Sequence, residues 1–395
     1  MSKILIAGGG IGGLAAALAC ARAGAQVELF ERAGEFAEVG AGIQLGPNVV
    51  KVLHGWGLEE ALADVLAFPQ RLQVRSAVSG AELGVLRLGA EMLQRYGSPY
   101  ATIHRADLHG LLLKALQPQR DVRLHLATTV TGFAQQGAGV TLHTSDGGVA
   151  QGDALVGADG LWSQVRRQLL HDVPPHATGH LAYRALVRQS SLPERLRSQQ
   201  VTVWLGPRLH VVQYPVRAGA WLNVVAITHG HVEGDVENWD HGANAAQLRR
   251  ALAATCRPLQ ELVQAIESWR LWALNIRPPM RGAHEQAQGR VALLGDAAHP
   301  MLPYLAQGAG MAMEDANELA QVLGRVVVNP GLDVPAALRH YAARRWQRNA
   351  RVQAGAIRNG QVFHAVGLLR WGRDAALKLL GERLLDMPWL YRGQP

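Results

Sequence analysis

A glycine-rich stretch near the N-terminus has the spacing of a phosphate-binding loop. Gly8, Gly10 and Gly13 form the pattern G-x-G-x-x-G. In this pattern the first glycine permits a tight turn, the second lets a pyrophosphate approach the backbone, and the third lets a helix pack closely on a strand. The N–H groups of the helix N-terminus then face the phosphates. Alone, the pattern also fits a glycine-rich turn that binds nothing.

An acidic residue stands where a dinucleotide-binding fold needs one. Glu31 ends the second apolar run, about 20 residues after the glycine loop, where a carboxylate commonly accepts hydrogen bonds from ribose hydroxyls. The loop also follows a predicted strand and opens a predicted helix. The sequence therefore predicts a dinucleotide site but does not distinguish FAD from NAD. Its expected residues are Gly8, Gly10, Ile11, Gly13, Glu31 and Arg32.

Two further motifs lie downstream. Leu155–Gly160 ends in an Asp-Gly pair, and Gly289–Pro300 contains a Gly-Asp pair and is followed by Gly308–Gly310. Asp296, at the end of a predicted strand, could accept hydrogen bonds from the hydroxyls of a ligand, or it could cap a helix. The helix expected from Gly308 would direct its positive end at an electron-rich group.

These motifs, in this order, resemble those of the class A (single-component) flavoprotein aromatic hydroxylases, and the resemblance covers nearly the whole chain. It implies that Asp159 and Gly160 serve both FAD and the nicotinamide cofactor. It also implies that Asp296 binds the ribityl chain and that Arg105 contacts FAD. The residues it places beside the flavin ring are Gly42, Ile43, Gly308, Ala309 and Gly310. The loop around Gly42 could otherwise be an ordinary glycine turn.

The same resemblance implies a reaction. NAD(P)H, with NADH favoured, would reduce FAD, and O2 would add to give a flavin C4a-hydroperoxide that hydroxylates an activated ring. The protein would position the ring, exclude water and help to deprotonate a phenol. Because a phenol has a pKa of about 10, a base or hydrogen-bonding relay should accelerate that step.

Three residues are the catalytic candidates. His210 and Tyr214 are four apart in an alternating strand pattern, so both should lie on one face of a sheet. The corresponding residues line the substrate pocket in relatives similar to 3-hydroxybenzoate 6-hydroxylase and 6-hydroxynicotinate 3-monooxygenase; His210 could otherwise be a packed structural histidine. Tyr304 stands where related enzymes place a substrate-facing side chain. Its neighbour Pro303 replaces the Gln of the 6-hydroxylases, so the position of hydroxylation stays open.

Arg184 belongs to a Tyr-Arg pair that is similar to one in salicylate-hydroxylase-like chains. It could bind a carboxylate or NADH, or it could be an ordinary exposed arginine of a strand.

The expected elements form an α/β fold. A strand over residues 3–7, a helix over 14–23 and a strand over 26–31 make a βαβ start, which implies a parallel sheet. Residues 180–275 alternate as an antiparallel sheet does. We predict a Rossmann-like FAD-binding domain with an inserted antiparallel-β substrate domain and a C-terminal helical segment. The expected bounds are 1–72, 97–178 and 279–335 for the FAD-binding domain, 73–96 and 179–278 for the substrate domain, and 336–395 for the helical segment.

Composition narrows the class further. The chain has 395 residues, two cysteines and a net charge of +8. Two cysteines cannot form a disulfide framework, which favours a reducing, cytoplasmic location. No stretch is long and apolar enough to span a membrane, so no membrane insertion is expected. Five arginines with helical spacing fit a solvated helix face or a field that attracts anions, and no nucleic-acid motif accompanies them. They are Arg344, Arg345, Arg348, Arg351 and Arg358.

The sequence predicts no metal site. His229 and His231 are paired, but no cysteine or further acid–histidine spacing supports ligation, so a solvated loop is expected.

The function predicted is an FAD-dependent monooxygenase that uses NAD(P)H and O2 on a small hydroxylated aromatic carboxylate of the salicylate or hydroxybenzoate type. The alternatives are a 6-hydroxynicotinate-type heteroaromatic hydroxylase, a flavin-dependent oxidoreductase that inserts no oxygen, and a flavin-containing binding module. A homodimer is expected by analogy only.

Overall fold

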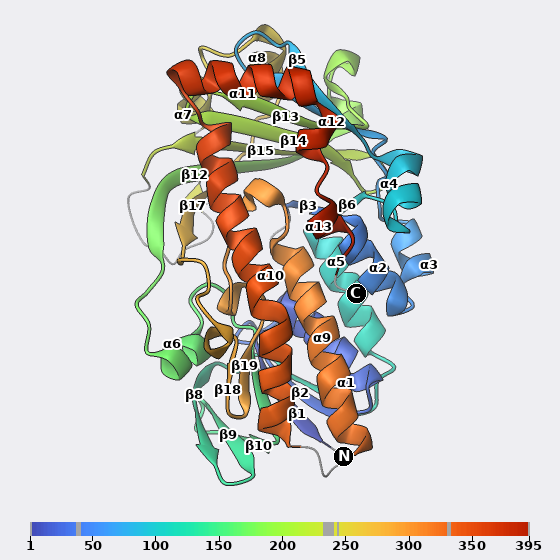
Figure 1. Ribbon diagram of the computed structural model, residues 1–395, viewed down its shortest axis with the longest axis vertical. Helices are drawn as coiled ribbons and strands as arrows, with labels where there is room; N and C mark the ends of the chain where they lie inside the picture. The colour runs from blue at the N-terminus through green and yellow to red at the C-terminus, as the bar shows by residue number, and fades with distance from the viewer. Residues whose placement is uncertain (1, 37–40, 232–240, 243–244, 330–332, 394–395) are drawn as a thin grey trace. The chain divides into compact units, whose positions relative to one another are not determined.

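The computed structural model describes residues 2–36, 41–231, 241–242, 245–329 and 333–393 (Figure 1). The chain forms two compact units, each built from three segments. Unit 1 comprises Met1–Val39, Ala106–His176 and Ile276–Ala356, and unit 2 comprises Gly40–Arg105, Ala177–Asn275 and Ile357–Pro395.

Unit 1 is built on a six-stranded sheet. Its order is β18-β19-β11-β1-β2-β7, and all neighbours are parallel except the edge strand β18. The central strands β1 (Lys3–Ala7) and β11 (Ala154–Gly157) are almost entirely buried. Such continuous apolar strands are typical of a parallel sheet that is covered on both faces. The remaining strands are β2 (Gln26–Phe30), β7 (Val122–His125), β18 (Ala287–Gln288) and β19 (Val291–Leu293).

Helices and a small sheet complete unit 1. Helix α1 (Ile11–Arg22) packs along α9 (Gly308–Val328), and both are visible side by side in Figure 1. The close approach depends on small side chains, because a Cβ at Gly324 would lie 3.1 Å from that of Ala23. The other elements are α5 (Arg105–Leu116), α6 (Gln164–Leu170), β8 (Val130–Gln136), β9 (Gly139–Thr144) and β10 (Val149–Gly152).

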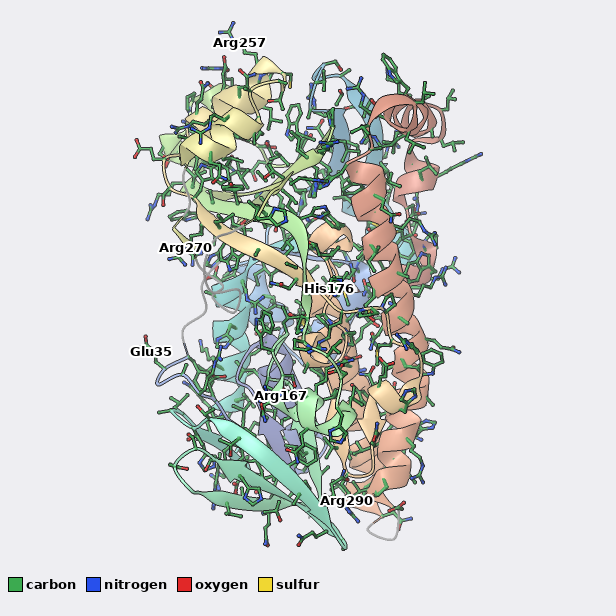
Figure 2. The ribbon with its side chains drawn as sticks, turned by 90° about the vertical axis from the view of Figure 1, so that its left-hand side faces the viewer. Glu35, Arg167, His176, Arg257, Arg270 and Arg290 are labelled. Carbon is green, nitrogen blue, oxygen red and sulfur yellow. The ribbon has the colours of Figure 1, made fainter. Side chains whose placement is uncertain are left out.

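Unit 2 is built on an eight-stranded, mainly antiparallel sheet of order β16-β17-β12-β15-β14-β13-β4-β5. Among the strand pairs that the structure describes in this sheet, β13 and β4 run parallel and the others run antiparallel. One face forms an apolar core with α7 (Ala245–Ala251) and α8 (Arg257–Gln264), and Arg257 projects outward from α8 (Figure 2). The strands are β4 (Arg71–Ser76), β5 (Glu82–Arg87), β12 (His176–Arg188), β13 (Val201–Gly206), β14 (Leu209–Val216), β15 (Trp221–His229), β16 (His241–Gly242) and β17 (Arg270–Ile276).

The chain ends in helices. Helix α10 (Val334–Phe363) begins in unit 1 and ends in unit 2, and α11 (Gly367–Leu380), α12 (Glu382–Leu385) and α13 (Pro388–Tyr391) follow in unit 2. This arrangement confirms the predicted α/β class with a β-rich insert and a helical C-terminal segment. No helix of the described residues is long and apolar enough to cross a bilayer.

The boundaries of the units differ from the expected domain bounds at residues 40–72 and 97–105. Strand β3 (Gly42–Leu45) pairs with β6 (Ala101–His104), and this hairpin is tied to the large sheet of unit 2. The Gly42 N–H donates to Asn223 at 2.6 Å, and the Thr102 hydroxyl donates to the carbonyl of Pro215. These contacts form only in three dimensions, so the spacing of residues in the sequence could not report them.

The arginines of α10 do not all lie on a solvated face, which corrects one expectation. Arg351 and Arg358 are exposed, but Arg345 is fully buried. Its guanidinium lies 2.7 Å from the carboxylate of Asp315 and 2.8 Å from that of Glu314. Helical spacing alone could not separate an arginine that faces solvent from one that faces buried carboxylates.

Candidate cofactor and substrate site

The glycine loop joins β1 to α1 in a conformation that only glycine adopts easily. Gly8 has a φ of +104°, and a Cβ there would lie 2.4 Å from the carbonyl oxygen of Ala158. A Cβ at Gly13 would lie 1.9 Å from the carbonyl oxygen of Gly8, so α1 can begin here only without that side chain. Gly10 caps α1 and has no side chain that could occupy the free N–H groups of its first turn.

Glu31 braces this loop. Its carboxylate accepts hydrogen bonds from the N–H groups of Gly9 at 2.5 Å and Ala33 at 2.8 Å. The structure thus brings the acid and the loop together within unit 1. Sequence reasoning missed His109 of α5, whose ring Nε2 lies 2.8 Å from the carbonyl oxygen of Gly9. Only its place among the apolar residues of a helix could have drawn attention to it.

Asp159 follows the end of β11 by two residues, and its carboxylate binds N–H groups in the first turn of α6, next to the N-cap residue Ser163. Its carboxylate accepts hydrogen bonds from the Ser163 hydroxyl at 2.5 Å and from the N–H groups of Gln164 and Val165 at 2.8 and 3.1 Å. Burial nevertheless raises the pKa of this carboxyl. Gly160 follows with a φ of +78° and has no atom within 4 Å of where a Cβ would stand, so this part of the loop offers room beside the backbone.

Asp296 lies beside the N-terminus of α9. The position of a Cβ at Gly308, the first residue of that helix, is 4.0 Å from the Asp296 carboxylate. A helix of 21 residues directs its positive end at this point, with Ala309 and Gly310 in its first turn.

A buried network of hydrogen bonds and ion pairs supports the turn at Gly295 and Asp296. His299 Nε2 lies 2.5 Å from Asp315, whose other oxygen accepts from Arg345 at 2.7 Å, and the Gly295 N–H donates to Asp315 at 3.3 Å. Burial acts to raise the pKa of Asp315, but the charges of His299 and Arg345 hold it well below its ordinary value. His299 is therefore placed as a positioning residue of the turn.

These features of unit 1 fit FAD. The loop at Gly8 and Gly13 excludes side chains, the surroundings of Gly160 are open, and two helix N-termini offer N–H groups to an anionic ligand.

Unit 2 contributes a polar sheet face, opposite the apolar core. In the register His180 pairs with His229, Arg184 with Val225, and Tyr214 with Asn223. Because side chains alternate between faces, one face collects every second residue of three strands. Its polar members include His180, Arg184, Arg188, His210, Tyr214, Asn223 and His229.

The hairpin loop at Gly42 meets this face. The Gly42 N–H donates to the Asn223 side chain, and a Cβ at Gly42 would lie 2.4 Å from a ring carbon of Tyr214. Ile43 follows in β3 and pairs with Ile103, while Arg105 begins α5 and donates its backbone N–H to Ala41. Burial raises the pKa of the Tyr214 hydroxyl above its ordinary range, so this group is a hydrogen-bond donor at neutral pH.

Two buried donors on the polar face lack a partner among the residues that the structure describes. They are Nε of Arg184 and Nδ2 of Asn223. The Arg184 guanidinium lies 4.7 Å from the centre of the Trp272 ring, so Arg184 is not the exposed strand residue that was one expectation. Burial lowers the pKa of Arg184 to about 10, which still leaves it charged at neutral pH. Unpaired buried donors point to a ligand that accepts hydrogen bonds.

His210 is 2% exposed and lies deep in this face. Its Nδ1 is 2.8 Å from Nε2 of His364, and its ring meets Phe363 edge-on. Burial and the neighbouring imidazoles hold its pKa well below the ordinary value, so His210 is neutral at pH 7. Tyr304 lies in unit 1, where burial raises the pKa of its hydroxyl. Sequence reasoning missed Asn223 and His364, because neither belongs to a motif.

The comparisons with known proteins agree with this architecture. A family model described as "FAD binding domain" matches residues 1–356. The chain is 38% identical over 391 residues to a 3-hydroxybenzoate 6-hydroxylase of Polaromonas naphthalenivorans, covering 98% of this chain and 95% of the relative. It is 36% identical over 357 residues to a 6-hydroxynicotinate 3-monooxygenase of Bordetella bronchiseptica, covering 89% of each.

Solved structures give the same result. Klebsiella pneumoniae HpxO, complexed with FAD and uric acid, superposes with a TM-score of 0.85 at 28% identity, covering 97% of this chain and 94% of that one. A salicylate hydroxylase substrate complex superposes with a TM-score of 0.83 at 29% identity, covering 100% and 96%. The class predicted from the motifs is thereby confirmed. The chain belongs to the FAD-binding domain family and, within it, to the FAD-dependent aromatic monooxygenases.

Proposed function

We propose that this enzyme uses NADH or NADPH, and O2, to hydroxylate a small aromatic ring that carries a hydroxyl and a carboxylate. The observation that carries the substrate class is the half-buried, charged Arg184, whose Nε–H is buried and unpaired, on the same face as Tyr214 and Asn223. A buried guanidinium is stabilised by an anion that it can hydrogen-bond, and a carboxylate matches its geometry. The names of the relatives support an aromatic acid.

The residues of unit 1 that would hold FAD are the loop Gly8–Gly13, Glu31, Asp159, Gly160, Asp296 and the start of α9. When bound, FAD supplies the electron transfer from the nicotinamide cofactor and the activation of O2. We favour NADH over NADPH, because NADH is the cofactor that the resemblance to the class A flavoprotein aromatic hydroxylases implies.

The residues of unit 2 would bind the substrate and move its proton. The Arg184 guanidinium binds the carboxylate, and the Asn223 amide and Tyr214 hydroxyl donate hydrogen bonds to polar groups of the ring. Neutral His210 lies on the same face as Tyr214 and Asn223 and is suited to accept the phenol proton. The apolar surroundings exclude water from this step.

The decisive experiment is a panel of hydroxylated benzoates. NADH oxidation should rise with the true substrate, and hydroxylated product, identified by mass, should form in step with the O2 consumed. Hydrogen peroxide as the sole product from every member would overturn the monooxygenase assignment. It would favour the oxidoreductase that inserts no oxygen.

A second candidate is a heteroaromatic acid of the hydroxynicotinate type. The similarity to the Bordetella enzyme over 89% of the chain favours it. Adding 6-hydroxynicotinate to the same panel decides between the two, because the preferred ring will show the higher kcat/KM.

The proposed role of His210 is tested by His210→Ala. We expect hydroxylation to slow by about 10²-fold or more, the usual contribution of a general base, while flavin reduction changes little. Stopped-flow measurement of the two half-reactions separates these effects. Equal slowing of both would remove His210 from the proton path.

A further inference from the structure

Three histidines converge at one edge of the polar sheet face of unit 2. They are His180 of β12, His229 at the end of β15, and His364 directly after α10. One ring nitrogen of each lies within 4.8 Å of those of the other two. These residues are far apart in sequence, so the cluster has no motif. His229 is a strand residue, not the loop residue expected from its pairing with His231.

The backbone fixes the three side chains in place. His180 and His229 are directly opposed across β12 and β15, which holds their Cβ atoms about 5 Å apart. His364 is held on both sides: Arg208 donates its N–H to the His364 carbonyl at 3.2 Å, and the Arg373 guanidinium donates to the carbonyls of Val362 and Phe363. The site is therefore largely formed before any ligand arrives.

The ring nitrogens have the spacing of metal ligands. His229 Nε2 lies 3.0 Å from His364 Nδ1, and the His180 ring is 4.5 and 5.0 Å, centre to centre, from those of His229 and His364. Tetrahedral Zn²⁺ with Zn–N bonds of about 2.0–2.1 Å separates its nitrogen ligands by about 3.3 Å. Small rotations of His180 and of the exposed His229 would reach that geometry.

His210 acts as the outer partner that a ligating histidine usually has. If Nδ1 of His364 binds the ion, its Nε2–H can donate to Nδ1 of His210, 2.8 Å away. Such a bond from the second ring nitrogen fixes the tautomer and the ring orientation of a metal ligand.

The charges around the cluster select the kind of ion. His180 is half-buried, His229 is exposed and His364 is buried, and each offers one imidazole nitrogen, a neutral ligand atom. No carboxylate belongs to the described cluster, and the positive charges of Arg208 and Arg373 nearby act against any cation that imidazole does not bind strongly. Such a site disfavours Ca²⁺ and Mg²⁺, which need anionic oxygens, and suits ions that bind imidazole strongly.

We propose that His180, His229 and His364 form a binding site for a divalent transition-metal ion of the Zn²⁺, Ni²⁺ and Cu²⁺ class, with water completing the coordination. None of the three histidines is among the residues that would hold FAD. It ties the segment after α10 to two strands of the sheet.

The test uses the full-length FAD-loaded enzyme without a histidine tag, stripped of metal by a chelator. Titration with ZnCl2 in a calorimeter should show one ion bound per chain. His229→Ala and His180→Ala should each weaken the affinity at least about ten-fold. Co²⁺ should add visible absorption bands typical of nitrogen ligation in the native enzyme and not in His229→Ala.

His231→Ala is the matched control, since His231 is exposed and only two residues from His229. It should bind Zn²⁺ as the native enzyme does. Flavin absorbance checks that each variant is folded, and His229 is exposed enough for its replacement to be tolerated. Failure of the native enzyme to bind one ion, or equal affinities for His229→Ala and His231→Ala, would overturn the proposal.

Discussion

The guanidinium of Arg184 lies over the Trp272 ring, and its buried Nε has no hydrogen-bond acceptor among the described residues. Leaving a charged donor unpaired costs free energy, which a ligand that accepts its hydrogen bond would recover. A hydrogen bond between charged groups contributes about 1.5–3 kcal/mol, which corresponds to about 10- to 100-fold in affinity. Arg184→Gln should therefore raise the KM for an aromatic carboxylate by about that factor. The KM for the matching carboxamide should change little.

The control for this change is Arg188→Gln. Arg188 lies on the same strand, four residues on, and stacks on Trp221 at the exposed end. Steady-state kinetics at constant flavin content would measure both variants. An unchanged KM in Arg184→Gln, or an equal rise in Arg188→Gln, contradicts a carboxylate-binding role.

At this scale, motifs could be predicted from the sequence and long-range partners could not. Gly8 and Gly13 are recognisable because their surroundings leave no room for a side chain, so glycine is required at these two positions and their spacing in the sequence is fixed. Asn223 and His364 are placed by strand register and by the end of a long helix. Nothing in their neighbouring residues reports that Asn223 meets Gly42, 181 positions away.

Among the elements, α10 contributes a buried ion-pair network to unit 1. Arg345 is fully buried and binds both Glu314 and Asp315 of α9. Arg345→Leu would leave two buried carboxylates short of a partner, so we expect a loss of about 3–5 kcal/mol in the free energy of unfolding. Thermal or urea unfolding would measure it.

Arg339→Ala on the same helix is the control. Arg339 is exposed and lies 3.9 Å from the equally exposed Asp333. Surface pairs contribute little, so the stability should stay close to that of the native enzyme. If both variants lost a comparable free energy of unfolding, the loss would come from any change in α10 and not from the buried ion pairs of Arg345.

Asp315 gives the same network a pH dependence. The pKa of Asp315 is held below its ordinary value in the folded protein. Its ionised form therefore stabilises the fold, and this stabilisation is present in full above about pH 3.9, the pKa of an aspartate in an unfolded chain. That contribution is lost as the pH falls toward the folded pKa. Asp315→Asn should therefore flatten the dependence of unfolding free energy on pH below about pH 4, measured by urea unfolding. An unchanged slope would contradict the linkage.

The elements themselves were largely predictable. Alternation indicated strands at β13 and β14, and a continuous apolar run with a glycine loop indicated β1 and α1, because both periodicities follow from which faces are buried. The inward direction of Arg345 was not predictable, since a buried ion pair breaks the rule that charged residues mark the solvated face.

For the whole molecule, the net charge of +8 should attract anionic substrates and cofactors. Raising the ionic strength from about 0.01 M to 0.1 M shortens the Debye length from about 30 to 10 Å. We expect the KM for an aromatic carboxylate to rise by about two-fold or more over this range, while a neutral analogue is unaffected. A flat response would mean that the charge does not assist binding.

The order of strands in unit 2 has a consequence for biosynthesis. The hairpin of β4 and β5 is complete at Arg87, but its neighbour β13 begins only at Val201. The helices α11 and α12, which pack on β5, begin only at Gly367. At about 5–20 residues per second, a ribosome leaves this hairpin edge uncovered for many seconds. The nascent chain is therefore expected to need shielding from aggregation, and truncation before α11 should leave the strand edge exposed rather than yield a smaller stable enzyme.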